Sequence, residues 1–204
     1  MDVLDAIRSD RAVAVIRGER VSDPAGLAAT LVDAGIRAIE FTFTIPAVLA
    51  VIEAAVDSGA LIGAGTVRDE QQARDALSAG AQFLVSPACV REVARVAQEA
   101  DVPVFLGALT PTEVDAALKA GTTAVKLFPA GIGGPGYLRD LHGPFPDADF
   151  IPSGGVTEEN ARAFLDAGAI AVYAGSGLAP PDLVTAGNHE EIRRRAHAFV
   201  ATLG

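Results

Sequence analysis

Two ionisable side chains stand inside short apolar runs, where a charge loses its hydration. Lys126 lies in the run Ala124–Phe128, and Glu40 lies in the run Ala38–Phe43. Burial lowers the pKa of a lysine because it destabilises the ammonium form, and the neutral amine can attack a carbonyl carbon. A glutamate facing the same cavity could carry protons to and from the reacting atoms. These side chains predict an imine-forming lysine with a carboxylate as its proton carrier.

The choice of lysine at position 126 is itself informative. The chain contains 14 arginines but only two lysines, Lys119 and Lys126. An arginine cannot lose its proton at neutral pH, so a lysine is needed where an amine must act as a nucleophile. Two other roles of Lys126 remain open on this strand alone: an ion pair with Glu40, or simple binding of phosphate. An ion pair is the weaker explanation, because burying two opposite charges contributes little to stability.

Short β-branched or apolar runs alternate with longer stretches of helical periodicity along the chain. The expected strands are Ala12–Ile16, Ala38–Thr42, Leu61–Ala64, Phe83–Ser86, Val104–Leu106, Ala124–Leu127, Phe150–Ile151 and Ala171–Tyr173. Helical periodicity is clear in Pro24–Ala34, Glu70–Ala79, Thr112–Ala120, Glu158–Ala167 and His189–Leu203. Strand–helix units of about 20 to 25 residues are typical of βαβ proteins and predict a parallel sheet.

A weak internal repeat supports this organisation. Four helical stretches end, just before a strand, in a leucine, one or two further residues and then Ala-Gly, with the glycines at positions 35, 80, 121 and 168. Glycine at such a position takes the left-handed conformation that ends a helix. A doubly wound open sheet is the competing architecture, but the number of units in 204 residues favours a barrel. We predict an α/β protein with one domain, a (β/α)8 TIM barrel over residues 1–204.

The alternation of side chains along each strand indicates which residues face the barrel interior. If Val125 and Leu127 face the helices, Lys126 points inward. Glu40 has the inward parity of its strand, since the aromatic and isoleucine residues beside it pack outward. Arg17 shares the inward parity of the two valines of the first strand. Lys126 and Glu40 are therefore expected to converge in one cavity, with Arg17 near its mouth.

Further candidate residues follow the strands at the end of a barrel where active sites lie. The planar fork of Arg17 could hold a carboxylate, and Thr66 follows a strand whose glycines let a ligand approach the backbone. Glycine-rich turns at 152–156 and 174–177 follow the seventh and eighth strands. Their backbone N–H groups, with the hydroxyl of Ser153 or Ser176, could bind a phosphate.

Composition argues against several classes of function. The net charge of −10 opposes binding to nucleic acid and anionic membranes, because both depend on Lys and Arg contacts. No apolar run approaches the roughly 18 residues that span a bilayer, and the first residues lack a secretory pattern. The single cysteine, Cys89, is expected to be a packing residue and is consistent with a cytoplasmic protein.

Neither a metal nor a cofactor is expected. The histidines, His142, His189 and His197, fall in a loop and in the last helix, so they do not predict a metal site. No Gly-x-Gly-x-x-Gly motif follows a strand and opens a helix, so no nicotinamide cofactor is assigned. The run Arg193–Arg195 is interpreted as a solvated face of the last helix.

Seven motifs in order resemble one known family over nearly the whole chain. They are Ala14–Gly18, Ile39–Thr44, Ile62–Val67, Phe83–Pro87, Val125–Pro129, Pro152–Val156 and Gly175–Ser176. The chain resembles the 2-keto-3-deoxy-6-phosphogluconate aldolases of the Entner–Doudoroff pathway. The resemblance implies a homotrimer of (β/α)8 barrels that acts on a phosphorylated keto acid.

The same resemblance assigns roles to individual residues. Lys126 matches the Schiff-base lysine, and Glu40 matches the general acid and base. Arg17 and Thr66 match positions near the pyruvate end of the substrate. The phosphate-binding positions of the family match Gly154, Gly155 and Ser176.

The chain departs from some members of the family at Thr44, where they carry an arginine that contacts the substrate. Arg17 is then the arginine left for that role, and the substrate stays open between the gluconate compound, its galactonate epimer and 4-hydroxy-2-oxoglutarate. Two alternatives of other kinds are a sugar-phosphate isomerase or epimerase that uses Lys126 only as a charge, and a non-catalytic metabolite-binding barrel.

Overall fold

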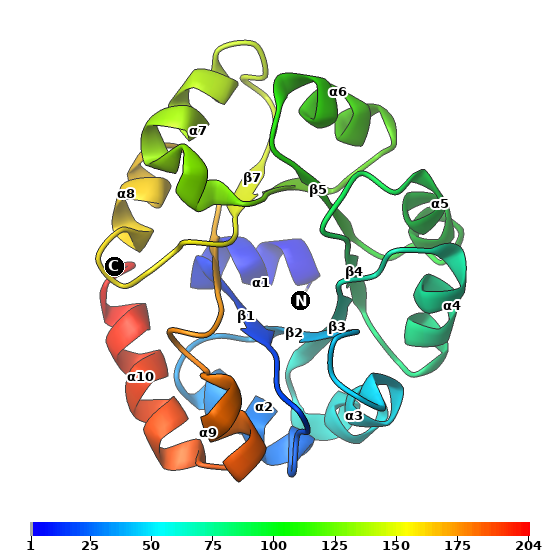
Figure 1. Ribbon diagram of the computed structural model, residues 1–204, viewed down its shortest axis with the longest axis vertical. Helices are drawn as coiled ribbons and strands as arrows, with labels where there is room; N and C mark the ends of the chain where they lie inside the picture. Colours follow the sequence, from blue (N-terminus) through cyan, green and yellow to red (C-terminus); the bar gives the residue numbers. More distant parts are fainter. Residues whose placement is uncertain (1) are drawn as a thin grey trace.

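The apolar runs form strands that pair side by side and run in parallel (Figure 1). The computed structural model describes residues 2–204. Over that range the sheet has eight strands in the order β7-β6-β5-β4-β3-β2-β1-β8. They are β1 (Ala12–Ile16), β2 (Ala38–Thr42), β3 (Leu61–Gly65), β4 (Phe83–Val85), β5 (Val104–Ala108), β6 (Ala124–Leu127), β7 (Phe150–Pro152) and β8 (Val172–Ala174).

The order of the strands brings the ends of the sheet together. Consecutive strands pair with each other, and β8 pairs with β1, where Tyr173 lies opposite Val13. At the remaining junction the backbone N–H of Ile170 donates to the carbonyl oxygen of Phe150 over 3.1 Å. The prediction of a single (β/α)8 barrel is confirmed, and the alternative of an open doubly wound sheet is wrong.

Helices surround the sheet on its outer side (Figure 1). They are α2 (Pro24–Asp33), α3 (Val48–Ala55), α4 (Glu70–Ser78), α5 (Arg91–Glu99), α6 (Pro111–Lys119), α7 (Gly134–His142), α8 (Ala161–Asp166), α9 (Pro181–Ala186) and α10 (His189–Ala201), with short 3-10 turns η1 (Val56–Ser58) and η2 (Ala130–Ile132). Local sequence fixes several boundaries. Thr110 and Glu113 form a capping box at the start of α6. Gly35 and Gly168 follow α2 and α8 with φ values of 95° and 104°, the left-handed geometry predicted for them.

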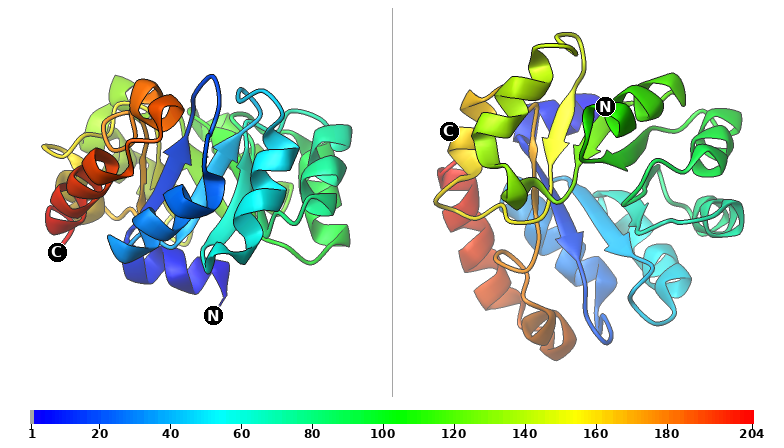
Figure 2. Two further views of the ribbon diagram at one scale, coloured as in Figure 1. Left: turned by 90° about the horizontal axis from the view of Figure 1, so that it is seen from below. Right: turned by 45° about the horizontal axis from the view of Figure 1, so that its top comes forward.

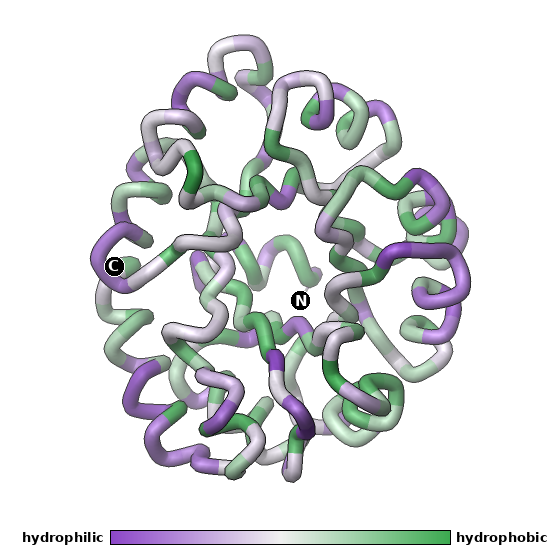
Figure 3. The backbone as a smooth tube through the Cα atoms, in the orientation of Figure 1, coloured by the Kyte–Doolittle hydropathy of each residue, from purple (hydrophilic) through white to green (hydrophobic). Residues whose placement is uncertain are grey.

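Side-chain parity separates two apolar layers. Val13, Val15, Phe83, Phe105 and Ile151 belong to a buried cluster inside the barrel. Residues of the opposite parity on the same strands pack against the helices in a larger outer cluster. The hydropathy colouring follows this arrangement, with hydrophobic strands inside and hydrophilic segments on the surrounding helices (Figure 3). The barrel interior is thus a packed core up to the level of the site.

A helix that the sequence did not predict closes one end of the barrel. Helix α1 (Val3–Asp10) lies across the end at which the strands begin, opposite the loops that follow them (Figure 2). Its Val3 and Ile7 belong to the interior cluster. Because this end is filled by α1, a ligand must enter from the opposite end, where the strands finish.

The expected boundaries are correct within one or two residues for the strands, and β1, β2 and β6 match fully. The helix expected at Glu158–Ala167 is wrong at its start, since α8 begins at Ala161. The side chain of Asn160 accepts from the backbone N–H of Thr157 and donates to the carbonyl oxygen of Gly155. These bonds hold a turn in place of the first helical turn.

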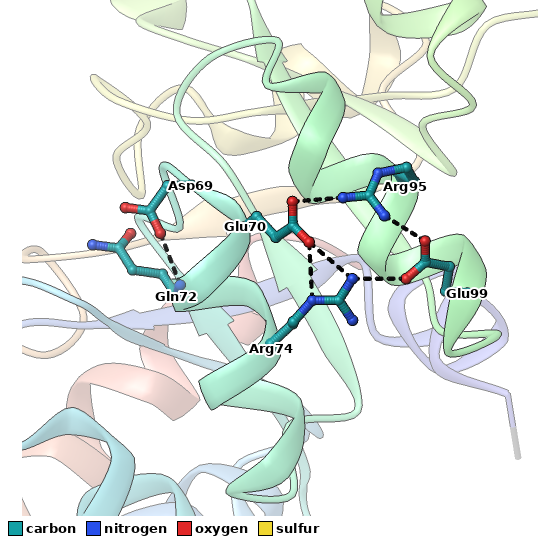
Figure 4. Close-up of polar contacts among 6 residues, drawn as sticks. All are labelled: Asp69, Glu70, Gln72, Arg74, Arg95 and Glu99. Atoms are coloured by element: carbon teal, nitrogen blue, oxygen red, sulfur yellow. Dashed lines mark hydrogen bonds and ion pairs between the residues drawn. The ribbon is translucent and has the colours of Figure 1, made fainter.

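An exposed network of ion pairs joins α4 to α5 (Figure 4). Arg74 and Arg95 each contact both Glu70 and Glu99, at distances from 2.5 to 3.0 Å. Hydrogen bonds from Arg95 and Arg74 lower the pKa of Glu70, and hydrogen bonds from Arg74 and Arg95 lower that of Glu99. These pairs stand in solvent, so salt screens them and they contribute less than the buried contacts beneath.

No helix within residues 2–204 is long and apolar enough to cross a membrane.

Candidate functional site

Lys126 and Glu40 meet inside the barrel. Lys126 on β6 and Glu40 on β2 come from opposite sides of the strand order, and Lys126 Nζ donates to Glu40 Oε2 over 3.4 Å. Lys126 is 3 % exposed and Glu40 is 0 % exposed. Both side chains point into the barrel interior and meet there, as their strand parity predicts. Their neighbours across the sheet are glycines, Gly107 beside Lys126 and Gly63 beside Glu40.

Burial lowers the pKa of Lys126. Loss of hydration is the largest cause, and the positive charge of Arg17 acts in the same direction. The negative charge of Glu40 and its hydrogen bond oppose the shift without reversing it. Desolvation prevails because a nearly enclosed ammonium has one long bond to a carboxylate in place of several to water. The result is an amine with a larger neutral fraction, which is the form that attacks a carbonyl.

One carboxylate oxygen of Glu40 accepts a hydrogen bond and the other does not. Its Oε2 accepts from Lys126, whereas Oε1 is buried with no hydrogen-bond partner among residues 2–204. The carboxyl group lies directly against Gly65 on β3: a Cβ atom there would stand 1.7 Å from Oε1 and 2.3 Å from Cγ. A glycine at 65 is therefore what lets Glu40 reach the centre of the barrel. Oε1 of Glu40 is thus buried against Gly65 without a hydrogen-bond partner.

Tyr173 on β8 adds an aromatic ring to the pair. Lys126 Nζ lies 4.5 Å from the centroid of the ring, a distance at which the π face attracts a cation. Sequence reasoning used Tyr173 only as the end of an expected strand and did not place it in the site. A signal was available: the side chain has inward parity and precedes the glycine-rich turn at 174–177.

A cavity of about 380 Å³ opens at the ends of β1, β7 and β8. It is lined by Val15, Arg17, Phe128, Ser153, Gly154, Gly155, Val156, Tyr173, Gly175, Ser176 and Gly177. Among these lining residues Arg17 carries the one positive charge, and none is acidic. In a chain of net charge −10, Arg17 gives this cavity a local positive charge.

The predicted phosphate-binding positions lie together in this cavity. Gly154 and Gly155 have φ values of 76° and 82°. This is the left-handed region of backbone conformation, which glycine adopts readily and residues with a side chain rarely adopt. Gly155 also packs against Gly131, where a Cβ would stand 2.7 Å from Gly131 Cα. Ser176 lines the same cavity from the adjacent loop, and Ser153 is buried beside it.

Thr66 and Thr44 stand apart from this cavity. Thr66 follows β3 directly after Gly65 and has a positive φ of 58°, but it does not line the cavity. Thr44 Oγ1 lies 2.6 Å from Thr42 Oγ1, so its hydroxyl is engaged at the end of β2. Lys126 and Glu40 do not line the cavity either. Tyr173 connects the two regions, because it lines the cavity and lies over Lys126.

The remaining candidate groups lie elsewhere. Cys89 is partly buried against the outer core, as expected of a packing residue, and burial raises the pKa of its thiol. Within residues 2–204 no group of three or more His, Cys, Asp or Glu side chains could hold a metal ion.

Comparison with known proteins gives consistent matches. Residues 3–195 match the family model described as KDPG and KHG aldolase. The chain is 33% identical to the 2-dehydro-3-deoxy-phosphogluconate aldolase of Treponema pallidum, over 99% of this chain and 98% of that protein. It is 36% identical to the 2-dehydro-3-deoxy-6-phosphogalactonate aldolase of Escherichia coli, over 92% of each.

A solved structure is similar over nearly its whole length. The KDPG aldolase of Legionella pneumophila, captured with pyruvate at low pH as a covalent carbinolamine intermediate, superposes with a TM-score of 0.89. It is 29% identical and covers 97% of this chain and 98% of its own.

The lowered pKa of Lys126 predicts that its amine reacts at a lower pH than the amine of an exposed lysine. The neutral amine is present at a lower pH than for an exposed lysine, so methylation by formaldehyde and cyanoborohydride is expected to begin at lower pH at Lys126. Peptide mass spectrometry over a pH series measures this, with the exposed Lys119 as internal reference. A midpoint for Lys126 at or above that of Lys119 would contradict the expected shift.

Gly65→Ala tests the placement of Glu40. The new Cβ would occupy the space of the carboxyl group, so Glu40 must turn away from Lys126 or the strands must separate. We expect a loss of about 1–3 kcal/mol in the free energy of unfolding by urea, and at least a tenfold loss of turnover.

Gly136→Ala is the matched control. A Cβ at Gly136 in α7 meets nothing within 4 Å, and alanine favours a helix. Wild-type stability in Gly65→Ala would show that this glycine is not needed to seat Glu40.

Proposed function

The chain belongs to the family of KDPG and KHG aldolases, and we propose that it cleaves 2-keto-3-deoxy-6-phosphogluconate through a Schiff base on Lys126. The products are pyruvate and glyceraldehyde 3-phosphate. The enzyme is a carbon–carbon lyase, an aldolase of class I. The observation that carries the assignment of Lys126 is its burial beside Glu40, with an amine whose pKa is lowered.

The first step makes an electron sink. The neutral amine of Lys126 attacks the C2 carbonyl of the keto acid to give a carbinolamine, and loss of water leaves an iminium. The positive nitrogen can accept the electron pair of the C3–C4 bond when that bond breaks. The ring of Tyr173 lies where it would stabilise this cation.

The proton transfers are assigned to Glu40. Its carboxylate removes the proton of the C4 hydroxyl as C3–C4 breaks, which releases glyceraldehyde 3-phosphate and leaves a pyruvate enamine. The same group returns a proton to C3, and hydrolysis of the imine then releases pyruvate. The free Oε1 of Glu40 supports this role, because the other oxygen is engaged by Lys126.

The two ends of the substrate are assigned to different groups of residues. Arg17 binds the carboxylate of the keto acid, with Thr66 at the pyruvate end. Gly154, Gly155 and Ser176 bind the phosphate through backbone N–H groups and a hydroxyl. The placement of Arg17 and the two glycine turns around one cavity supports this assignment. Fixing both ends aligns the reacting carbons with Lys126 and Glu40, which is the origin of positional catalysis.

The same chemistry would serve two related substrates. One is the galactonate epimer, which appears in the name of the Escherichia coli relative. The other is 4-hydroxy-2-oxoglutarate. Each offers a 2-keto acid to Lys126 and a C4 hydroxyl to Glu40. An isomerase or epimerase that used Lys126 only as a charge would not need a lysine whose pKa is lowered. We propose further that the protein is cytoplasmic and forms a homotrimer. Sedimentation of the purified chain can test the trimer.

Trapping with pyruvate and borohydride tests the nucleophile. Reduction of the imine is expected to leave a stable adduct on Lys126, identified by peptide mass spectrometry. Lys126→Arg retains a positive charge but has no nucleophilic amine, so both the adduct and the turnover should disappear. Lys119→Arg removes the other lysine, on the surface of α6, and should retain both. An unmodified Lys126 in the wild type would refute the Schiff-base mechanism.

Glu40→Gln separates imine formation from proton transfer. The amide keeps the shape of the side chain but cannot take up a proton, so pyruvate should still be trapped while cleavage slows by about 10²–10⁴-fold. Deuterium exchange at C3 of pyruvate should slow in parallel. Glu53→Gln, on the exposed face of α3, is the control. Exchange at the wild-type rate in Glu40→Gln would assign the proton transfers to another group.

A further inference from the structure

We infer that the hydroxyl of Tyr173 is a substrate-binding group that donates a hydrogen bond to the carboxylate of the keto acid once it reaches Lys126. This inference rests on the proposed function, because the acceptor is the acid group next to the carbonyl that Lys126 attacks. It adds to Arg17 and Thr66 a further contact at the pyruvate end of the substrate.

The hydroxyl of Tyr173 is buried without a partner. Its oxygen is enclosed, and no group among residues 2–204 forms a hydrogen bond with it. A buried polar group in this state destabilises the fold, so such a group calls for a functional explanation. The other tyrosine shows the usual arrangement: Tyr137 donates to the carbonyl oxygen of Leu109 over 2.7 Å.

The hydroxyl is confined to the role of donor. Burial and the negative charge of Glu40 raise the pKa of Tyr173 well above its ordinary value. The phenol therefore keeps its proton throughout the range in which the enzyme would work, and it cannot act as a general base. A donor of this kind is matched by an anionic acceptor, for which charge-assisted hydrogen bonds are strongest.

The position of Tyr173 indicates that its hydroxyl contacts the keto-acid half of the substrate. Its ring lies 4.5 Å from Lys126 Nζ, and the hydroxyl is attached directly to that ring. In the imine, C2 is bonded to Nζ and the carboxylate is bonded to C2, so the carboxylate is the anionic group nearest to the ring. Tyr173 also lines the cavity together with Arg17, which supplies the positive charge for the same group. The phosphate, several bonds farther along the substrate, is the ligand of the glycine turns.

Tyr173→Phe tests the inference because it removes the oxygen and keeps the ring. We expect the pyruvate concentration for half-maximal inactivation by borohydride to rise about tenfold or more. The maximal rate of inactivation should stay within about twofold, since the ring still faces Lys126. In the condensation direction the KM for pyruvate should rise, whereas that for glyceraldehyde 3-phosphate should not change.

Stability gives an independent readout. Tyr173→Phe removes an unpaired hydroxyl, so its Tm should equal or exceed that of the wild type. Tyr137→Phe is the matched control: it loses a hydrogen bond made in the fold, so its Tm should fall while its pyruvate dependence stays unchanged. A structural role for Tyr173 would instead lower Tm and leave the half-saturating pyruvate concentration unaffected.

The outcomes separate this inference from the proposed function. If the wild type is trapped and Tyr173→Phe requires the same pyruvate concentration, the role of Tyr173 is refuted and the Schiff-base mechanism stands. If pyruvate does not inactivate the wild type in borohydride, the mechanism fails and the role of Tyr173 fails with it. A rise in the KM for glyceraldehyde 3-phosphate alone would place the hydroxyl at the other half of the substrate and overturn the inference.

Discussion

The burial of one amine governs the arrangement of the site. Lys126 is almost fully enclosed, so its ammonium form cannot be hydrated, and its pKa falls. The nearby carboxylate of Glu40 limits this fall through its charge and a hydrogen bond. A lone buried charge would be unstable, and a short, fully satisfied ion pair would hold the proton on the amine. The contact of 3.4 Å lies between these extremes: it partners the buried amine, and the pKa of Lys126 is still lowered.

Glycines create the space in which this pair can form. Gly65 leaves room for the carboxyl group of Glu40, and Gly63 leaves room for the ring of Phe83. At Gly107, a Cβ would stand 2.1 Å from the carbonyl oxygen of Pro87, so that glycine admits the loop after β4. Large and small residues thus alternate across neighbouring strands, which is how a barrel of this size fills its interior. The charged pair occupies one layer of that packing.

The electrostatics of the site differ from those of the whole chain. The net charge of −10 would repel an anionic substrate, yet the cavity is lined by Arg17, glycine turns and serines, with no acidic side chain among its lining residues. The guanidinium of Arg17 gives the cavity a local positive charge without extra lysines. The charge of the cavity therefore differs in sign from that of the chain as a whole.

The sequence by itself determined the positions of the strands along the chain, the inward direction of Lys126, Glu40 and Arg17, and the glycine turns after β7 and β8, because alternation and turn chemistry are local. Only the tertiary structure decided that Gly65 makes room for Glu40, that Tyr173 covers Lys126 with an unpaired hydroxyl, and that α1 closes the far end. These contacts join residues far apart in the chain. They depend on how the strands are staggered around the barrel, and that stagger is set by the packing of all the strands together.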